Sequence, residues 1–152
     1  MTRRWILAAA LATACSGGGP QPPAPQSMTD ALTAFMAAVK ANDVQRMGWL
    51  WGTERGAAAG WMNDRELMQR LTIIQRYLTH VGYRIVEGPL PGPGGNQNLR
   101  TFRVELQRPQ CNTVFPMDVV RTRDGGWLVY DVHLTEVGNP RGACQPPPGT
   151  GR

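Results

Sequence analysis

The chain has 152 residues, of which 41% are hydrophobic and 18% are charged, and its formal net charge is +5 at pH 7. This length suits one domain of ordinary size that buries its own core. The basic side chains are scattered from Arg46 to Arg141 and form no run, which excludes the basic patch of a nucleic-acid-binding protein. The sequence holds no histidine pair at metal-ligand spacing, no Gly-rich phosphate loop and no nucleophile elbow, so we expect no metal site and no cofactor.

The start of the chain has the parts of an export signal. A basic segment, Thr2-Arg3-Arg4, precedes an apolar run from Trp5 to Ala12. The stretch Leu11-Ala12-Thr13-Ala14-Cys15 resembles the lipobox of bacterial lipoproteins. The resemblance implies that residues 1–14 are a cleaved signal peptide and that Cys15, carrying an acyl lipid such as palmitate, becomes the first residue of the mature protein.

Two other interpretations of this segment are a membrane-spanning helix and an ordinary secretory signal. A spanning helix needs about 20 apolar residues, but the chain turns into Ser16-Gly17-Gly18-Gly19-Pro20 before that length is reached. An ordinary signal has the same parts but gives no reason for Cys15. We therefore favour a lipid anchor on the periplasmic face of the bacterial cell envelope. An aspartate directly after the cysteine would resemble the inner-membrane retention signal of enteric bacteria. Ser16 stands there instead, which favours the outer membrane over the inner one.

The remaining cysteines fit an oxidising compartment. Residues 15–26 are rich in Gly, Pro, Gln and Ser and predict a flexible tether. With Cys15 used by the lipid, Cys111 and Cys144 form an even pair that we expect to be bonded to each other. A reactive or metal-binding pair is disfavoured, because neither has another Cys or His at ligand spacing. The tail at 139–152 is expected to be disordered except around Cys144.

The folded domain, expected at residues 27–138, begins with helical patterns. Residues able to cap helices stand before each pattern, at Ser27, Asp43 and Asn63. Apolar residues at helical spacing predict three helices: Met28 to about Ala41-Asn42, Val44 to Trp51, and Asn63 to Gly82. Aromatic residues in or beside the second helix are interpreted as core rather than as a ligand cage; these are Trp49, Trp51 and Trp61.

After Gly82 the apolar period changes from 3.6 to 2, which predicts strands. The predicted strands are Tyr83–Val86, Arg100–Gln107, Thr113–Thr122 and Trp127–Leu134. A long loop is expected at Pro89–Gly95, and Asp124-Gly125 predicts a tight hairpin. The order is that of an α+β fold, with three N-terminal helices packed on a curved antiparallel sheet of about four strands.

Two segments carry a resemblance to a known superfamily. The helix Ala31-Leu32-Thr33-Ala34-Phe35-Met36-Ala37-Ala38-Val39-Lys40-Ala41-Asn42-Asp43 is similar to the opening helix of nuclear-transport-factor-two-like proteins, and Asp124-Gly125-Gly126-Trp127-Leu128-Val129 resembles their last hairpin. The resemblance implies a cone with an apolar pocket at its wide end. The superfamily includes isomerases, dehydratases and members with no known catalysis, and its enzymes carry a carboxylate or histidine in the pocket.

Counting back from the hairpin brings three titratable residues together. With Asp124-Gly125 as the loop, Asp118 pairs with Asp131, Pro116 with His133, and Thr122 with Trp127; with Gly125-Gly126 as the loop, Asp118 faces His133. Close carboxylates and a histidine suit acid/base chemistry. However, the opposite face is apolar and should pack on the helices; its residues are Phe115, Met117, Val119, Leu128, Tyr130, Val132 and Leu134. The three residues then point outward, where Trp127, Val120 and Val129 would form a dimer or partner surface.

His80, the other histidine, suits the C-terminal end of the third helix, where a cation is favoured. We expect a lipid-anchored, non-catalytic domain that binds a partner protein or a small apolar ligand. The alternative is an acid/base isomerase or dehydratase that uses Asp118, Asp131 or His133. A structural protein that holds other envelope components at the membrane is compatible with the same sequence.

Overall fold

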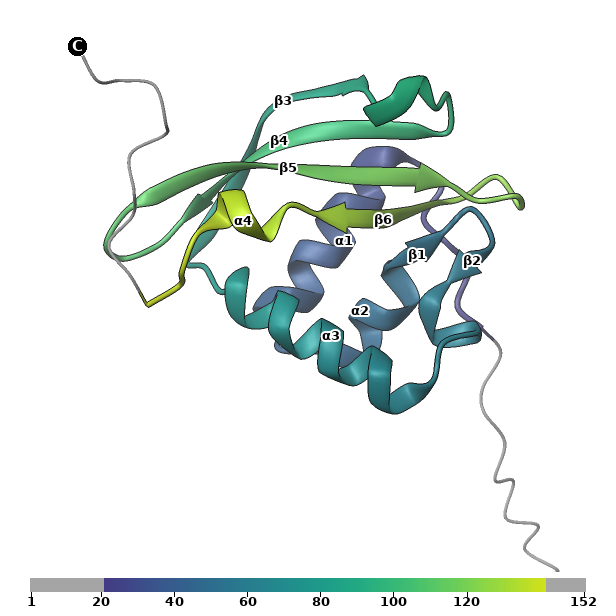
Figure 1. Cartoon of the computed structure of the whole chain (residues 1–152), viewed down its shortest axis with the longest axis horizontal. Helices are drawn as coiled ribbons and strands as arrows, with labels where there is room; N and C mark the ends of the chain where they lie inside the picture. The colour runs from purple at the N-terminus through teal and green to yellow at the C-terminus, as the bar shows by residue number, and fades with distance from the viewer. Residues whose placement is uncertain (1–20, 142–152) are drawn as a thin grey trace, which may run out of the picture.

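The computed structural model describes residues 21–141 (Figure 1). The predicted signal peptide, Cys15 and Cys144 therefore lie outside the described residues, as does most of the expected tail. The helical elements are α1 (Met28–Lys40), α2 (Val44–Leu50), the 3-10 turn η1 (Ala58–Gly60), α3 (Asp64–Tyr77), the 3-10 turn η2 (Pro93–Gly95) and α4 (Leu134–Val137). The strands are β1 (Gly52–Thr53), β2 (Gly56–Ala57), β3 (Gly82–Pro91), β4 (Leu99–Gln107), β5 (Asn112–Arg121) and β6 (Trp127–Val132).

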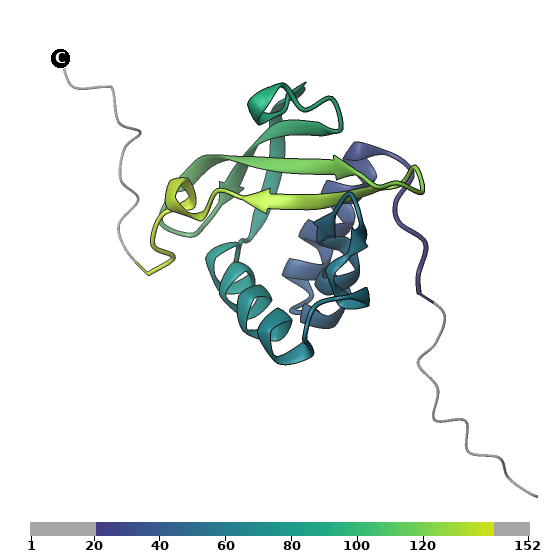
Figure 2. The same cartoon turned by 45° about the vertical axis from the view of Figure 1, so that its right-hand side comes forward.

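The main sheet has the order β3-β4-β5-β6, and each strand runs antiparallel to its neighbours. The prediction of an α+β fold with an antiparallel sheet of four strands is therefore confirmed. The helices α1, α2 and α3 lie along one face of this sheet (Figures 1 and 2). A small second sheet, formed by β1 and β2, was not predicted and separates α2 from α3 in the chain.

The predicted caps all accept backbone hydrogen bonds at the starts of their helices. The Ser27 hydroxyl accepts from the Asp30 amide at 3.0 Å, and the Asp43 carboxylate accepts from the Arg46 amide at 2.9 Å. The Asn63 side chain accepts from two amides of the first turn of α3. Such caps satisfy amides that have no partner inside the helix.

The first strand is longer than its sequence predicts. Helix α3 ends at Tyr77 rather than Gly82, and Gly82 instead opens β3. The strand continues through Pro89 to Pro91, with two register shifts against β4. Because β3 is an edge strand, a proline there removes no hydrogen bond that the sheet needs. The predicted break at Pro89 was therefore wrong.

The main core fills the space between the helices and the sheet. Its largest members are 0–2% exposed and come from both layers; they include Phe35, Met36, Leu71, Phe102, Val104 and Phe115. Burial of apolar surface on this scale dominates the stability of such a domain. As predicted, Trp49 and Trp51 pack against core clusters, whereas Trp61 is 43% exposed and not part of the core.

A bulge in β6 changes which side chains face the helices. Asp118 pairs with Asp131, but Val119 pairs with Val129, so Tyr130 is an extra residue. An extra residue reverses the alternation of side chains beyond it. Val129 therefore lies in the main core, and Tyr130 is 40% exposed.

This bulge overturns the predicted partner surface. Val120 and Val129 are 1% and 0% exposed, and Trp127 packs against the main core. Leu128, predicted to face the helices, instead joins a second cluster on the other face; the buried members of that cluster are Ala57, Leu99, Val120 and Leu128. The predicted two-residue turn was also wrong: the Thr122 amide donates to the Gly126 carbonyl oxygen at 2.8 Å, so Arg121, rather than Thr122, is the partner of Trp127.

Arg108 ties the ends of two helices to the turn between β4 and β5. Its guanidinium donates to the carbonyl oxygens of Tyr77 at 2.5 Å and Val137 at 3.4 Å. A cation satisfies carbonyl groups that lack partners at helix C-termini. His80 follows the end of α3, and its Nδ1 lies 2.7 Å from the Leu78 carbonyl oxygen.

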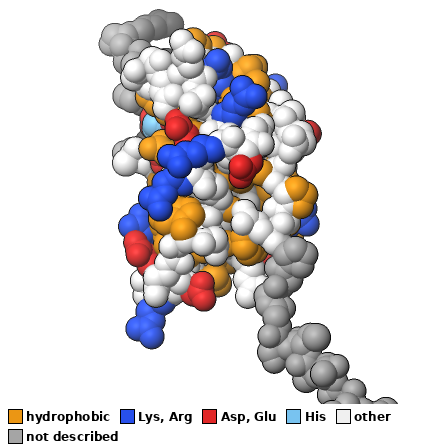
Figure 3. All heavy atoms as spheres, turned by 90° about the vertical axis from the view of Figure 1, so that its right-hand side faces the viewer, with side chains coloured by type: hydrophobic (Ala, Val, Ile, Leu, Met, Phe, Trp, Pro, Cys, Tyr) orange, Lys and Arg blue, Asp and Glu red, His pale blue; other side chains and the backbone are white. Residues whose placement is uncertain are grey.

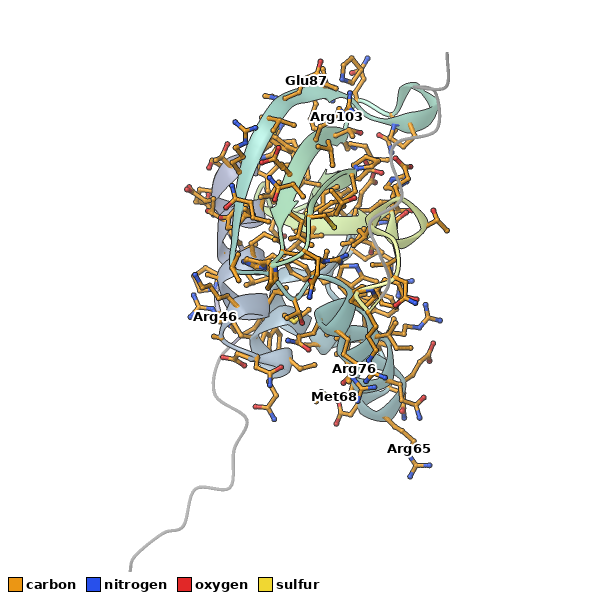
Figure 4. The ribbon with its side chains drawn as sticks, turned by 90° about the vertical axis from the view of Figure 1, so that its left-hand side faces the viewer. Arg46, Arg65, Met68, Arg76, Glu87 and Arg103 are labelled. Carbon is orange, nitrogen blue, oxygen red and sulfur yellow. The ribbon has the colours of Figure 1, made fainter. Side chains whose placement is uncertain are left out.

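The edge of the sheet farthest from β6 carries surface ion pairs. Nη1 of Arg103 on β4 lies 3.7 Å from Oε2 of Glu87 on β3. In Figure 4 this pair lies at the opposite end of the molecule from α3, which carries Arg65, Met68 and Arg76. Exposed pairs of this kind contribute about 0–1 kcal/mol each. They keep this edge charged, which disfavours pairing with another strand.

Within residues 21–141, none of the helices has both the length and the apolar character that a membrane-spanning helix requires.

Candidate functional site

Asp118, Asp131 and His133 lie together on the face of the sheet that turns away from the main core. The Nε2 atom of His133 is 3.0 Å from Oδ2 of Asp118 and 3.9 Å from Oδ2 of Asp131. Asp118 and Asp131 are directly paired across β5 and β6. The arrangement combines the Asp118–Asp131 pairing of one predicted register with the Asp118–His133 approach of the other.

His133 reaches Asp118 because the chain leaves the sheet at that point. Strand β6 ends at Val132, two residues before the predicted end, and α4 begins at Leu134. The His133 amide still donates to the Pro116 carbonyl oxygen at 3.3 Å. Just past the end of β6, the imidazole contacts Asp118.

Asp118 is a buried carboxylate that is fully engaged. It is 2% exposed, and its Oδ1 accepts from the Thr101 hydroxyl at 2.5 Å while its Oδ2 accepts from His133. A buried charge is costly unless it is paired and hydrogen-bonded, and these two donors meet that need. Thr101 was not predicted as part of the site, although it stands on the outward-facing side of β4 and pairs directly with Asp118.

The electrostatic environment favours the protonated form of His133. Partial burial lowers the pKa of its imidazole, but the hydrogen bond that it donates to Asp118 and the charges of Asp118, Asp131 and Glu136 outweigh burial, so the pKa is raised above the ordinary value. Glu136 contributes from α4, with its Oε1 3.9 Å from the His133 Nδ1. The side chain of His133 is 33% exposed, which leaves it accessible to solvent.

A pocket of about 350 Å³ opens on the same face of the sheet, beside the β1–β2 hairpin. Leu99 and Val120 are buried residues of the second cluster, and they form its apolar floor. The remaining lining residues are polar, charged or aromatic: Thr53, Glu54, Arg55, Trp61, Asn96, Arg123 and Tyr130. Figure 3 looks onto this end of the molecule, where basic and acidic side chains lie among hydrophobic ones.

The walls of this pocket are held in place by contacts between distant segments. The Arg123 amide donates to the Glu54 carbonyl oxygen at 3.0 Å, and the Asn96 and Asn98 amides donate to the Glu54 carboxylate at 3.3 and 3.4 Å. The Arg55 guanidinium lies 5.3 Å from the centre of the Trp61 ring, a cation–π distance. The pocket is therefore preformed.

The side chains that line this pocket indicate which kind of ligand it would bind. Glu54 is engaged by two amides, whereas Arg55 and Arg123 present two positive charges beside exposed Trp61 and Tyr130. Exposed aromatic and Arg side chains in a concave site are typical of ligand and partner recognition. The site suits a group with an apolar or aromatic body and a negative charge.

A second hollow of about 580 Å³ lies between α2 and the segment that precedes α1. Its lining includes three prolines of that segment, Pro22, Pro23 and Pro25, together with Trp49 and Arg46. The segment is bound to the domain, because the Trp127 amide donates to the Pro25 carbonyl oxygen at 2.7 Å. This hollow is formed by the end of the predicted tether.

Cys111, at the turn between β4 and β5, is in a disulfide bond. Its predicted partner, Cys144, lies outside the described residues, so the pairing stays a prediction.

Comparisons of the chain with protein-family models, with curated proteins and with solved structures found no match. Function is therefore argued from the geometry of the site.

Proposed function

We propose that the protein is a lipid-anchored domain of the bacterial cell envelope, which binds a partner protein or a small ligand and performs no chemistry. The observation that carries the binding role is the preformed pocket formed by Arg55, Trp61, Arg123 and Tyr130 over the apolar floor. The anchor is supported by the sequence Leu11-Ala12-Thr13-Ala14-Cys15 alone.

The proposal includes a nuclear-transport-factor-two-like cone. The helices α1 to α3 on one face of a bent four-stranded sheet support it (Figures 1 and 2). The space that such a cone would offer to a ligand is occupied by core side chains such as Phe35 and Phe115, which are fully buried. We therefore assign binding to the outer face of the sheet rather than to the interior.

Binding is tested with a matched pair of probes that share a ring and differ in charge. The purified full chain, labelled with ¹⁵N, is titrated with indole-3-acetate and separately with indole-3-acetamide, while the indole N–H signal of Trp61 is followed. We expect the anion to shift the Trp61 signal and the backbone signals of Arg55 and Arg123, and the neutral probe to act at least about tenfold more weakly, a difference of about 1.4 kcal/mol.

Two variants show whether the probe occupies this pocket. Trp61→Ala should abolish the shifts of the Arg55 and Arg123 backbone signals, whereas Val86→Ala, which removes a similarly exposed apolar side chain from β3, should leave them unchanged. Equal binding of both probes, or binding that survives Trp61→Ala, would contradict the assignment.

The alternative function is acid/base catalysis by Asp118, Asp131 or His133. It is favoured by the two hydrogen bonds that Asp118 accepts, one from Thr101 and one from His133, which orient the imidazole. Against it, the group lies on the open face beside Asp131, whose side chain is 58% exposed, rather than in a water-excluding cavity. Isomerisation of an activated ketone that is lost in His133→Gln and retained in Trp61→Ala would favour this alternative.

A further inference from the structure

We propose that Asp118, Asp131 and His133 form a binding site for one divalent transition-metal cation, of which Zn²⁺ is the best fit. This site is distinct from the pocket beside the β1–β2 hairpin, and it does not depend on the proposed function.

The spacing of the three ligand atoms fits a cation after a small movement. Tetrahedral Zn²⁺ with bonds of about 2.0–2.2 Å holds its ligand atoms about 3.4 Å apart. The Nε2 atom of His133 is 3.0 Å from Oδ2 of Asp118 and 3.9 Å from Oδ2 of Asp131, and ligand atoms of all three residues lie within 4.8 Å of one another. The His133–Asp118 separation would widen by about 0.4 Å, and the exposed Asp131 would move about 0.5 Å closer to His133.

In each of the three residues, the side-chain atom that would not bind the cation has a hydrogen-bond partner or lies near a carboxylate. Oδ1 of Asp118 accepts from the Thr101 hydroxyl, and Oδ1 of Asp131 accepts from the Val132 amide at 2.8 Å. The Nδ1 atom of His133 faces Glu136 at 3.9 Å, close enough for a carboxylate to orient a metal-bound imidazole. Outer contacts of this kind orient metal ligands and strengthen binding.

The charge of the group points to the same ligand. Asp118, Asp131 and Glu136 surround one imidazole, and within residues 21–141 no Lys or Arg forms an ion pair with any of them. With His133 protonated, the three carboxylates leave two negative charges, and a divalent cation in place of that proton would leave one.

The donor set selects the kind of cation. One imidazole nitrogen with two carboxylate oxygens suits Zn²⁺ or Mn²⁺. Ca²⁺ takes six to eight oxygen ligands, and Mg²⁺ keeps most of its waters, so both should bind weakly to three ligands that include a nitrogen. The exposed side of the site leaves a position for water.

The site is tested by calorimetric titration of the untagged full chain after removal of metals with EDTA. We expect one Zn²⁺ to bind per chain, weaker binding of Mn²⁺, and binding of Ca²⁺ and Mg²⁺ at least about a hundredfold weaker than that of Zn²⁺. Asp131→Asn should weaken Zn²⁺ binding at least about tenfold. Asp124→Asn, which changes an exposed carboxylate in the β5–β6 turn, should leave Zn²⁺ binding unchanged.

A spectroscopic measurement identifies the ligand directly. In ¹⁵N spectra of the imidazole groups, Zn²⁺ should shift Nε2 of His133 and leave the ring of His80 unchanged. Because Asp131 is exposed, Asp131→Asn should fold normally, and its thermal unfolding without metal checks this. Absence of stoichiometric Zn²⁺ binding, equal affinity in Asp131→Asn, or a shift of His80 instead of His133 would each overturn the proposal.

Discussion

The Nε2 atom of His133 lies 3.0 Å from Oδ2 of Asp118, which joins a partly exposed imidazole to a carboxylate that is 2% exposed. An ionised carboxylate can only accept, so the imidazole donates in this bond. Thr101 donates to the other oxygen of Asp118, and the three side chains therefore link β4, β5 and the end of β6.

The Asp118–His133 pair should make stability depend on pH in the metal-free protein. The folded pKa of His133 is raised above its ordinary value of about 6.5 by Asp118, Asp131 and Glu136. A raised folded pKa means that the stabilising contribution is complete below the unfolded pKa and is lost as pH rises through the folded pKa. In EDTA, the difference in unfolding free energy between wild type and His133→Gln should therefore shrink as the pH rises from below about 6.5 to above it. Urea unfolding across this range checks it, and a difference that grows with pH would be inconsistent with the pair.

Removal of the Thr101 hydroxyl should cost more than an ordinary surface change. Thr101→Val keeps the shape of the side chain but leaves Oδ1 of buried Asp118 without its donor, which should lower the unfolding free energy by about 1–3 kcal/mol. Thr101→Ser keeps the donor and serves as the control. Equal stability of Thr101→Val and wild type in chemical denaturation would show that the bond contributes nothing.

The cap of α3 offers a local test of how this helix begins. Asn63→Ala removes the acceptor of the Arg65 and Glu66 amides and should lower the unfolding free energy by about 1 kcal/mol. Asn63→Asp keeps an acceptor at the same place and should retain stability. Thermal unfolding of both variants measures the difference, and an alanine variant as stable as the aspartate variant would contradict the capping role.

The sequence predicts the features of the fold that depend on neighbouring residues better than those that depend on contacts between distant segments. The caps at Ser27, Asp43 and Asn63 and the alternation along β4 are local, and each appears in the structure where the sequence places it. The Tyr130 bulge is not local. Either face of β6 carries apolar residues, and the contact of Leu128 with the second cluster, which includes Ala57 of β2, decides which residues turn inward.

Some residues of the candidate site could likewise be predicted from the sequence, and others depend on contacts between distant segments. Counting from a two-residue loop places Asp118 opposite Asp131, and the structure reaches this pairing by another route: the turn pairs Thr122 with Gly126, which shifts the register by one residue, and the Tyr130 bulge shifts it back. Thr101 enters only through the pairing of β4 with β5 across a different connection. The hairpin β1–β2, which supplies Arg55 to the pocket, has strands of two residues, too short to show a period.

The disulfide of Cys111 predicts a simple mass difference. If Cys144 is its partner, the mature chain alkylated after reduction should gain two more alkyl groups than the chain alkylated without reduction. Peptide mapping of the unreduced protein should then recover Cys111 and Cys144 in one linked peptide. A linked peptide that joins Cys111 to Cys15 would refute both this pairing and the lipid on Cys15.

The proposed lipid anchor would determine where the domain works, and one measurement tests it most directly. The protein is expressed in a bacterium as wild type and as Cys15→Ser, and membranes washed with carbonate are analysed by fractionation and mass spectrometry. We predict that the wild-type chain stays in the membrane, begins at Cys15 and carries the mass of attached acyl chains, while Cys15→Ser is released and has no lipid mass. A wild-type chain without lipid mass, or Cys15→Ser retained in the washed membrane, would contradict the anchor.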